Sequence, residues 1–156
     1  MTASPRGSRE GRMADPLPHE QVLVRLGRSE IHDIGVFACI AIETGTNVFA
    51  TDQRPISWVS SDLLEDPMLE DYQRAFYCDF AIRRDGLLGC PANFNLLTVG
   101  WYVNEPRPGD EPNLTCNARF DLIALRDILS GEELTIRYSD FHGEDPRAAI
   151  ARDDSA

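Results

Sequence analysis

Two polar side chains, Asn104 and Tyr138, each close a segment of the sequence that we predict to be a strand. Asn104 ends residues 101–104, and Tyr138 ends residues 131–138. An amide and a phenol are poor acid–base groups and poor metal ligands, but they can orient a neutral nucleophile beside a polar cofactor. We therefore expect these two side chains to meet at a pocket that aligns its reactants.

The composition of the 156 residues restricts the partners of such a pocket. The formal net charge is -11, which repels the phosphates of nucleic acids and of anionic membranes. We expect no nucleic-acid or membrane partner; a basic protein or peptide is compatible with this charge, and a role in solubility alone is the alternative. All 15 basic residues are arginine. This excludes a Schiff-base lysine and the phosphate-binding lysine of Walker-type nucleotide hydrolysis.

The cysteines and histidines are spaced too widely to predict a metal site. No C-x-x-C pair occurs, and the three histidines are equally far apart. No stretch resembles a signal peptide or a membrane span, so we expect a soluble intracellular protein, cytoplasmic or otherwise, with reduced thiols packed in its core. The sequence leaves open whether the chain is a monomer or a homodimer. The four cysteines are Cys39, Cys78, Cys90 and Cys116.

The elements that must position Asn104 and Tyr138 are predicted to be mostly short strands. Apolar residues at helical spacing predict one or two short helical turns between residues 60 and 72, with Ser60, Ser61 or Asp62 as possible N-caps. The pair Asp85-Gly86 predicts a hairpin. Polar composition predicts a disordered tail at 1–18, one domain at 19–142 and a polar tail at 143–156. Strands are predicted from residue 22 to Gly27 and at 35–40, 47–50, 76–82, 87–90, 97–103, 120–125 and 134–138.

Three segments of the sequence are weak motifs by themselves, but their occurrence together and in this order is specific. They read SEIHDIGVFA at 29–38, WYVN followed by PN at 101–113, and RDILSGEELTIRY at 126–138. Together they resemble the motifs S-x-I-H-G-x-G-V-F-A, N-H-S-x-x-P-N and R-D-I-x-x-G-E-E-L-T-x-x-Y of SET-domain protein-lysine methyltransferases. The resemblance implies a mainly β SET-domain fold of small β-sheets with few short helices, knot-like C-terminal threading and no flanking cysteine-rich segments.

The resemblance also implies an activity and a set of site residues. The activity is S-adenosyl-L-methionine-dependent methyl transfer to a lysine side chain of a basic protein or peptide, with Tyr138 as the catalytic residue that orients the amine. Asn104 would hold the amino-acid portion of the donor, and the backbone near Gly35 would approach it. The implied cofactor-binding residues are Ile34, Gly35, Val36, Asn104, Glu105, Tyr138 and Phe141. The implied substrate channel is formed by Tyr77, Phe80 and Tyr102.

Each of these residues also has an ordinary structural explanation. Asn104 is equally suited to capping a turn, and the aromatic side chains are equally suited to a core. The sequence departs from the motifs at Asp33, where the family has glycine, and at Glu105-Pro106, where it has His-Ser; the loop to Asn113 is also longer. Lost or weakened donor binding would leave a SET-like module that binds peptides or proteins. A small β-rich structural protein outside the family is the third reading.

Overall fold

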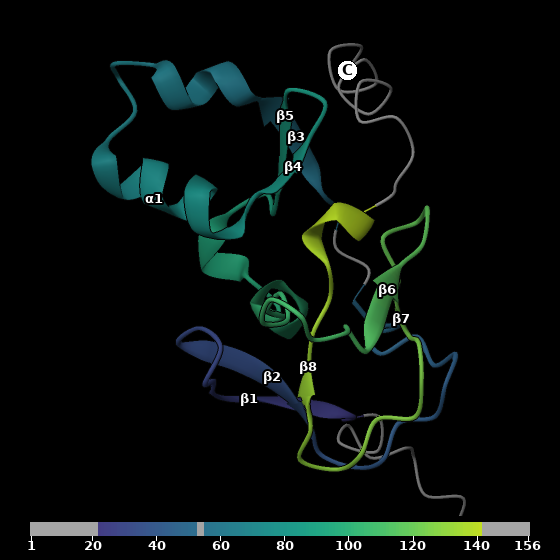
Figure 1. The fold of residues 1–156 in the computed structure, drawn as a ribbon. Helices are drawn as coiled ribbons and strands as arrows, with labels where there is room; N and C mark the ends of the chain where they lie inside the picture. Colours follow the sequence, from purple (N-terminus) through teal and green to yellow (C-terminus); the bar gives the residue numbers. More distant parts are fainter. Residues whose placement is uncertain (1–21, 53–54, 142–156) are drawn as a thin grey trace, which may run out of the picture.

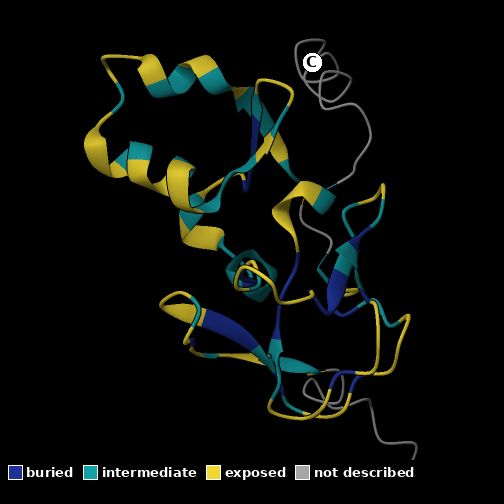
Figure 2. Cartoon of the chain, in the orientation of Figure 1, coloured by how far each residue is buried: buried dark blue, intermediate teal, exposed yellow. Residues whose placement is uncertain are grey.

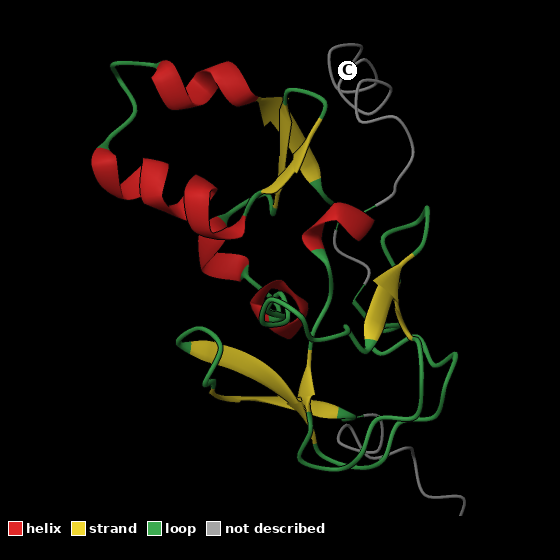
Figure 3. Cartoon of the chain, in the orientation of Figure 1, coloured by secondary structure: helices red, strands yellow, loops and turns green. Residues whose placement is uncertain are grey.

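The structure, a computed structural model, describes residues 22–52 and 55–141. In these ranges three small antiparallel sheets, one α-helix and several 3-10 helices form the fold (Figure 1, Figure 3). The predicted mainly β class with few short helices is confirmed. The tails predicted at 1–18 and 143–156 lie outside the described residues, and the division of the chain into tail, domain and tail stays a prediction.

The first sheet places the early motif at its centre. Strand β2 (Ile34–Ala38) lies between β1 (Val24–Arg28) and β8 (Glu133–Leu134), and both neighbours are antiparallel to it. Val36 is opposite Leu26 on one side and Leu134 on the other. Because both of its edges are paired, β2 holds the residues just before it in a fixed position beside β8.

The second sheet contains the hairpin predicted from the Asp85-Gly86 pair. Strand β5 (Leu87–Cys90) pairs with β4 (Ile82–Arg84) across this turn and with β3 (Ser57–Ser60) on its other edge. Asp85 and Gly86 have φ angles of 49° and 77°, the two positive values that a tight type I′ hairpin turn requires. The third sheet pairs β6 (Leu114–Cys116) with β7 (Leu122–Ala124).

The helical region extends further than the sequence predicted. The short turn η1 (Ser61–Glu65) is capped by the Ser60 side chain, as predicted. The helix α1 (Asp71–Phe80) occupies most of the segment 76–82 predicted as a strand, so that prediction is wrong except at β4. A capping box starts α1, because Glu70 and Gln73 each accept a hydrogen bond from the other's backbone N–H.

Three other predicted strands are also wrong in whole or in part. Residues 97–103 contain the 3-10 helix η3 (Val99–Tyr102), which follows the shorter turn η2 (Phe94–Leu96). Residues 47–50 form a turn with one bridge, from Asn47 to Ile123. The last strand ends at Leu134, and Tyr138 begins the 3-10 helix η4 (Tyr138–Asp140). Asn104 and Tyr138 therefore do not end long strands.

The C-terminal segment threads through the fold as predicted. Residues 134–136 run between the two ends of the loop 105–112, with parallel bridges from Thr135 to Asn104 and from Ile136 to Leu114. The backbone N–H of Ile136 donates to the Asn104 carbonyl over 3.0 Å, and that of Leu114 donates to the Thr135 carbonyl over 3.0 Å. This threading brings the two late motifs into direct contact.

The core lies mainly between the first and third sheets (Figure 2). Cys90 and Cys116 are buried, but Cys39 is only half-buried and Cys78 is exposed, so the prediction that all four thiols pack in the core is wrong. Among the helices that the structure describes, none is long and apolar enough to cross a membrane. The core cluster contains Val36, Ala38, Ile42, Val48, Val103, Leu114, Cys116, Leu122, Ala124, Ile128, Leu134 and Ile136.

Candidate active site

Tyr138 is held by contacts with the two residues on either side of Asn104. Its phenol donates a hydrogen bond to the carbonyl oxygen of Val103 over 3.2 Å, and its backbone N–H donates to Glu105 Oε1 over 3.1 Å. Burial raises the pKa of the Tyr138 phenol; the hydrogen bond from its backbone to Glu105 opposes this rise, and the negative charge of Glu105 adds to it. The phenol is therefore protonated at neutral pH, so it is available as a hydrogen-bonding group rather than as a base.

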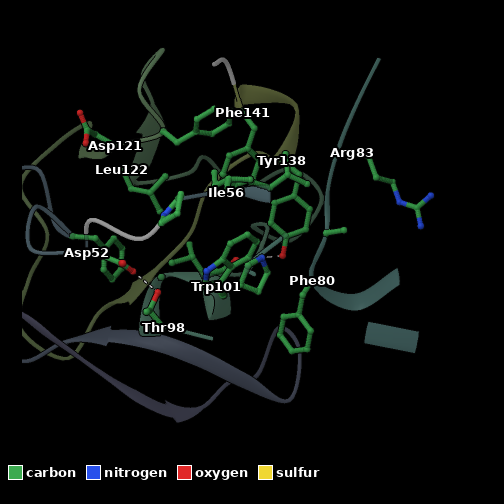
Figure 4. A pocket seen from close by; sticks show the side chains of 18 of the residues that line it. Asp52, Ile56, Phe80, Arg83, Thr98, Trp101, Asp121, Leu122, Tyr138 and Phe141 are labelled. Atoms are coloured by element: carbon green, nitrogen blue, oxygen red, sulfur yellow. Dashed lines mark hydrogen bonds between the residues drawn. The ribbon is translucent and has the colours of Figure 1, made fainter. Parts of the chain in front are cut away.

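A large pocket of about 970 Å³ adjoins Tyr138 (Figure 4). Tyr138 and Phe141 form part of its wall with their rings 6.1 Å apart, and Phe80 and Trp101 contribute further aromatic surface. The lining is mainly apolar. Its carboxylates belong to Asp52, which accepts a hydrogen bond from the Thr98 hydroxyl, and to Asp79 and Asp121.

Asn104 does not line this pocket. It belongs to a second cluster, formed with Ser29, His32, Ile34 and Glu133, which ties the early motif to β8. Its side-chain Nδ2 lies 3.0 Å from Glu133 Oε1, 3.1 Å from the Ile34 carbonyl oxygen, 3.2 Å from the His32 carbonyl oxygen and 3.3 Å from Ser29 Oγ. Asn104 is buried. Its amide group therefore already stabilises the loop before β2 without any ligand.

Gly35 is required by this cluster and not by an unusual φ angle. A Cβ atom built on Gly35 would lie 2.1 Å from Glu133 Oε1, the atom that accepts the hydrogen bonds of Ser29 and Asn104. The absence of a side chain thus lets the Glu133 carboxylate approach β2. Asp33 has a φ of 35°, so the aspartate that replaces the family glycine does adopt the left-handed conformation.

The other predicted site residues divide between the pocket and the core. Ile34 is exposed at the start of β2, whereas the side chain of Val36 is fully buried in the core and faces no pocket. Phe80 lines the pocket, and Tyr102 packs edge-on against it with ring centroids 5.5 Å apart. Tyr77 packs in the same way against Phe94, at 5.0 Å. Of the three residues predicted for the substrate channel, Phe80 lines the pocket, Tyr102 packs against Phe80, and Tyr77 packs against a residue that does not line the pocket.

Sequence reasoning missed two residues that organise the site. Glu133 accepts the hydrogen bonds of the second cluster, and its place as the second glutamate of the GEELT segment was the available signal. Asn113 is buried, accepts the Thr135 N–H at 2.8 Å and donates to the Glu133 carbonyl at 2.8 Å. Asn113 ends the segment that resembles the motif N-H-S-x-x-P-N, and this position in the motif was the signal from which its role could have been predicted. No group of three or more His, Cys, Asp or Glu residues in the described ranges could hold a metal ion.

Comparisons with known proteins give structural matches only. The fold resembles that of SET-domain methyltransferases. A candidate histone methyltransferase of Plasmodium falciparum matches with a TM-score of 0.47 and 14% identity, over 78% of this chain and 92% of that one. A humanized mutant of the Chaetomium thermophilum Polycomb Repressive Complex 2, bound to an inhibitor, matches with a TM-score of 0.48 and 21% identity, over 80% of this chain and 16% of that one.

Searches by sequence found no match. No family model matches the chain, and no curated protein matches it. At 14% and 21% identity, the structural matches concern only the arrangement of the chain.

Proposed function

We propose that the chain transfers a methyl group from S-adenosyl-L-methionine to a lysine side chain of a protein substrate. The observation that carries this proposal is the Tyr138 phenol, which is bonded to the Val103 carbonyl at the wall of a pocket of about 970 Å³. A protonated phenol and a backbone carbonyl can align an amine without removing a proton from a poor acid. Methyl transfer to an amine needs this alignment more than it needs a strong base.

The residues at the pocket fit both reactants in size and charge. The volume is within the range of small-molecule sites, roughly 300–1,000 Å³. The lining carries the carboxylates of Asp52, Asp79 and Asp121 and the guanidinium groups of Arg83 and Arg119, the second of which lies 3.8 Å from Asp121. The small negative excess attracts both the sulfonium of the donor and the ammonium of the acceptor. Tyr138 and Phe141 would hold the donor from the side of η4, whereas Ile34 and Glu105, which the resemblance also implies as cofactor-binding residues, do not line this pocket. When bound, the donor supplies the electrophilic methyl group.

The apolar part of the pocket also prepares the amine. Moving an ammonium ion out of water disfavours its charged form, so the apolar part of the lining lowers the pKa of an entering lysine and raises the fraction of neutral amine, while the carboxylates of the same pocket oppose this shift. The aromatic rings of Phe80 and Trp101 exclude water from the same volume. Tyr138 then needs only to fix the direction of the nitrogen lone pair.

One observation favours a second function, a SET-like module that binds a peptide or protein without a methyl donor. The Nδ2 of Asn104 is engaged by Glu133 and by the carbonyls of His32 and Ile34. An amide that already has these partners contributes less to a ligand than a free one. The exposed carboxylate of Asp33 adds a negative charge near this loop, which repels the carboxylate of the donor.

A thermal-shift titration with S-adenosyl-L-methionine separates the two functions. A ligand that binds only the folded chain stabilises it by about 2.7 kcal/mol at one hundred times its Kd. The enzyme predicts a concentration-dependent rise in Tm and labelled methyl-lysine in a mixture of basic proteins. No rise at millimolar donor, together with binding of basic peptides, would support the binding module. Because the sequence contains no lysine, labelled methyl-lysine must come from the substrate.

A further inference from the structure

Packing alone does not fix the position of Tyr138. The residue is 50% exposed, although it belongs to the wall of the large pocket. The short helix η4, which begins with Tyr138, has no buried residue, and its N-cap, Arg137, makes no side-chain hydrogen bond to the helix. A half-exposed ring at the start of a single 3-10 turn keeps its position only where polar contacts hold it. These contacts come from another part of the chain.

Three consecutive residues hold Tyr138 and the segment before it. The Val103 carbonyl accepts a hydrogen bond from the Tyr138 phenol over 3.2 Å. The Asn104 carbonyl accepts the backbone N–H of Ile136 over 3.0 Å. The Glu105 carboxylate accepts the backbone N–H of Tyr138 over 3.1 Å, and of these three contacts it is the one that depends on a side chain of the accepting residue. Tyr138 is therefore held at its phenol by a backbone carbonyl and at its N–H by a specific carboxylate.

The loop that begins at Glu105 restricts where its carboxylate can point. Pro106 follows, and a residue before proline is restricted to extended backbone conformations. Arg107 then donates to the carbonyl oxygen of Glu30 over 3.1 Å, and its guanidinium lies 3.5 Å from the Glu30 carboxylate. The ion pair is exposed and weak by itself, but the two contacts together tie the start of the loop to the segment before β2. The Glu105 carboxylate is thus presented from a backbone that is restrained next to it.

We propose that Glu105 is a positioning residue for methyl transfer. Glu105 does not line the pocket, whereas Tyr138, Ser139 and Phe141 of the η4 segment do. By accepting the N–H of Tyr138, its carboxylate fixes where η4 begins and therefore the direction in which the phenol reaches the pocket. The pair Glu105-Pro106, at which the sequence departs from the His-Ser of the motif, thus has a task of its own. The proposal rests on the proposed function, because it gives Glu105 a part in aligning the amine.

The first measurement reads the hydrogen bond without donor or substrate. Hydrogen exchange of the Tyr138 amide is followed by NMR in the 15N-labelled parent, in Glu105→Ala and in Glu105→Gln. Glu105→Ala removes the acceptor and should speed exchange of this amide about tenfold or more. The side-chain oxygen in Glu105→Gln can still accept the N–H and should keep most of the protection. The Ile136 amide, which is bonded to a backbone carbonyl, should exchange equally in all three chains and is the internal control.

The second measurement separates positioning from donor binding and from stability. Glu105→Ala should lower kcat about tenfold and leave KM for both donor and substrate unchanged, because the lost contact affects the alignment of the amine and not the binding of either reactant. Glu105→Gln should retain most of the parent kcat. Rates are compared well below the Tm of each variant, so that all chains are folded. Glu43→Ala, at an exposed glutamate outside the site, is the matched control and should behave as the parent.

The two measurements distinguish failure of this proposal from failure of the proposed function. Unchanged exchange of the Tyr138 amide in Glu105→Ala would refute the contact, whether or not the chain transfers methyl groups. Faster exchange with an unchanged kcat would refute the positioning role. A raised KM for the donor at constant kcat would assign Glu105 to donor binding and would also overturn the proposal. A parent chain without transfer removes the proposed function, and the exchange rates then still show whether Glu105 holds Tyr138.

Discussion

Replacing Gly35 by alanine tests whether the Glu133 carboxylate approaches the backbone of β2 as closely as the structure shows. The new Cβ atom would lie 2.1 Å from Glu133 Oε1 and 3.1 Å from Ser29 Cβ. The second contact is tight but is relieved by a small shift. The first cannot persist, so the Glu133 carboxylate must move away from Ser29 and Asn104.

The expected cost follows from the two hydrogen bonds that are lost. Both are accepted by a carboxylate, from Ser29 Oγ at 2.7 Å and from Asn104 Nδ2 at 3.0 Å. Hydrogen bonds to charged groups contribute about 1.5–3 kcal/mol each. Alanine recovers about 0.4–1 kcal/mol by restricting the unfolded chain, and Glu133 is not fully buried, so its carboxylate regains some hydration. We expect Gly35→Ala to reduce the free energy of unfolding by about 2–4 kcal/mol and Tm by roughly 5–15 °C.

The assay is denaturant unfolding of a double-mutant cycle. Gly35→Ala is measured in the parent and in Glu133→Ala, where the blocking carboxylate is absent. In the second background its cost should fall below about 1 kcal/mol. Gly100→Ala is the control, because a Cβ there would lie 3.6 Å from the Phe49 ring in ordinary contact. An equal cost of Gly35→Ala in both backgrounds would refute the close approach of Glu133 as the reason for glycine.

Two further predictions concern pH and thiol chemistry. The backbone N–H and then the hydroxyl of Thr44 hold the pKa of the Asp127 carboxyl below its ordinary value of about 3.9, so this carboxylate stabilises the fold above that pH and the contribution is lost as pH falls through the lowered value. Thr44→Val should therefore lower Tm at neutral pH by an amount that shrinks below about pH 4; a constant difference would contradict this. A thiol reagent should modify exposed Cys78 in the native chain but buried Cys90 and Cys116 only after unfolding, and rapid native labelling of Cys116 would contradict its burial.

Local signals in the sequence predicted the elements whose geometry they determine directly. The Asp85-Gly86 turn required positive φ angles that few residue pairs supply, and the hairpin follows. The Ser60 cap was recognisable in the same way. The strand predicted at 76–82 was wrong because the β propensity of its aromatic residues was given more weight than their spacing. Tyr72, Phe76 and Phe80 are four residues apart, which is the period of a helix face.

The candidate site was predictable in its residue types and not in its contacts. Tyr138, Phe80 and Phe141 were named from the sequence, and all three line the pocket. The partners of Asn104 lie far away along the chain, and no local pattern records which carbonyl or carboxylate its amide meets. The carboxylate of Glu105 accepts a hydrogen bond from the backbone N–H of Tyr138. The motif has histidine at this position and gave no reason to expect this contact.

The most direct test of the central claim is methyl transfer by the parent chain and by Tyr138→Phe. Labelled S-adenosyl-L-methionine is supplied with basic proteins, and methyl-lysine is counted in the hydrolysed substrate. The account predicts transfer by the parent and a loss of about 10²-fold or more in Tyr138→Phe, since a misplaced amine alone costs about that factor. Tyr72→Phe should retain full activity. Equal transfer by the parent and Tyr138→Phe, or none by the parent despite saturating donor, would contradict the proposed role of Tyr138.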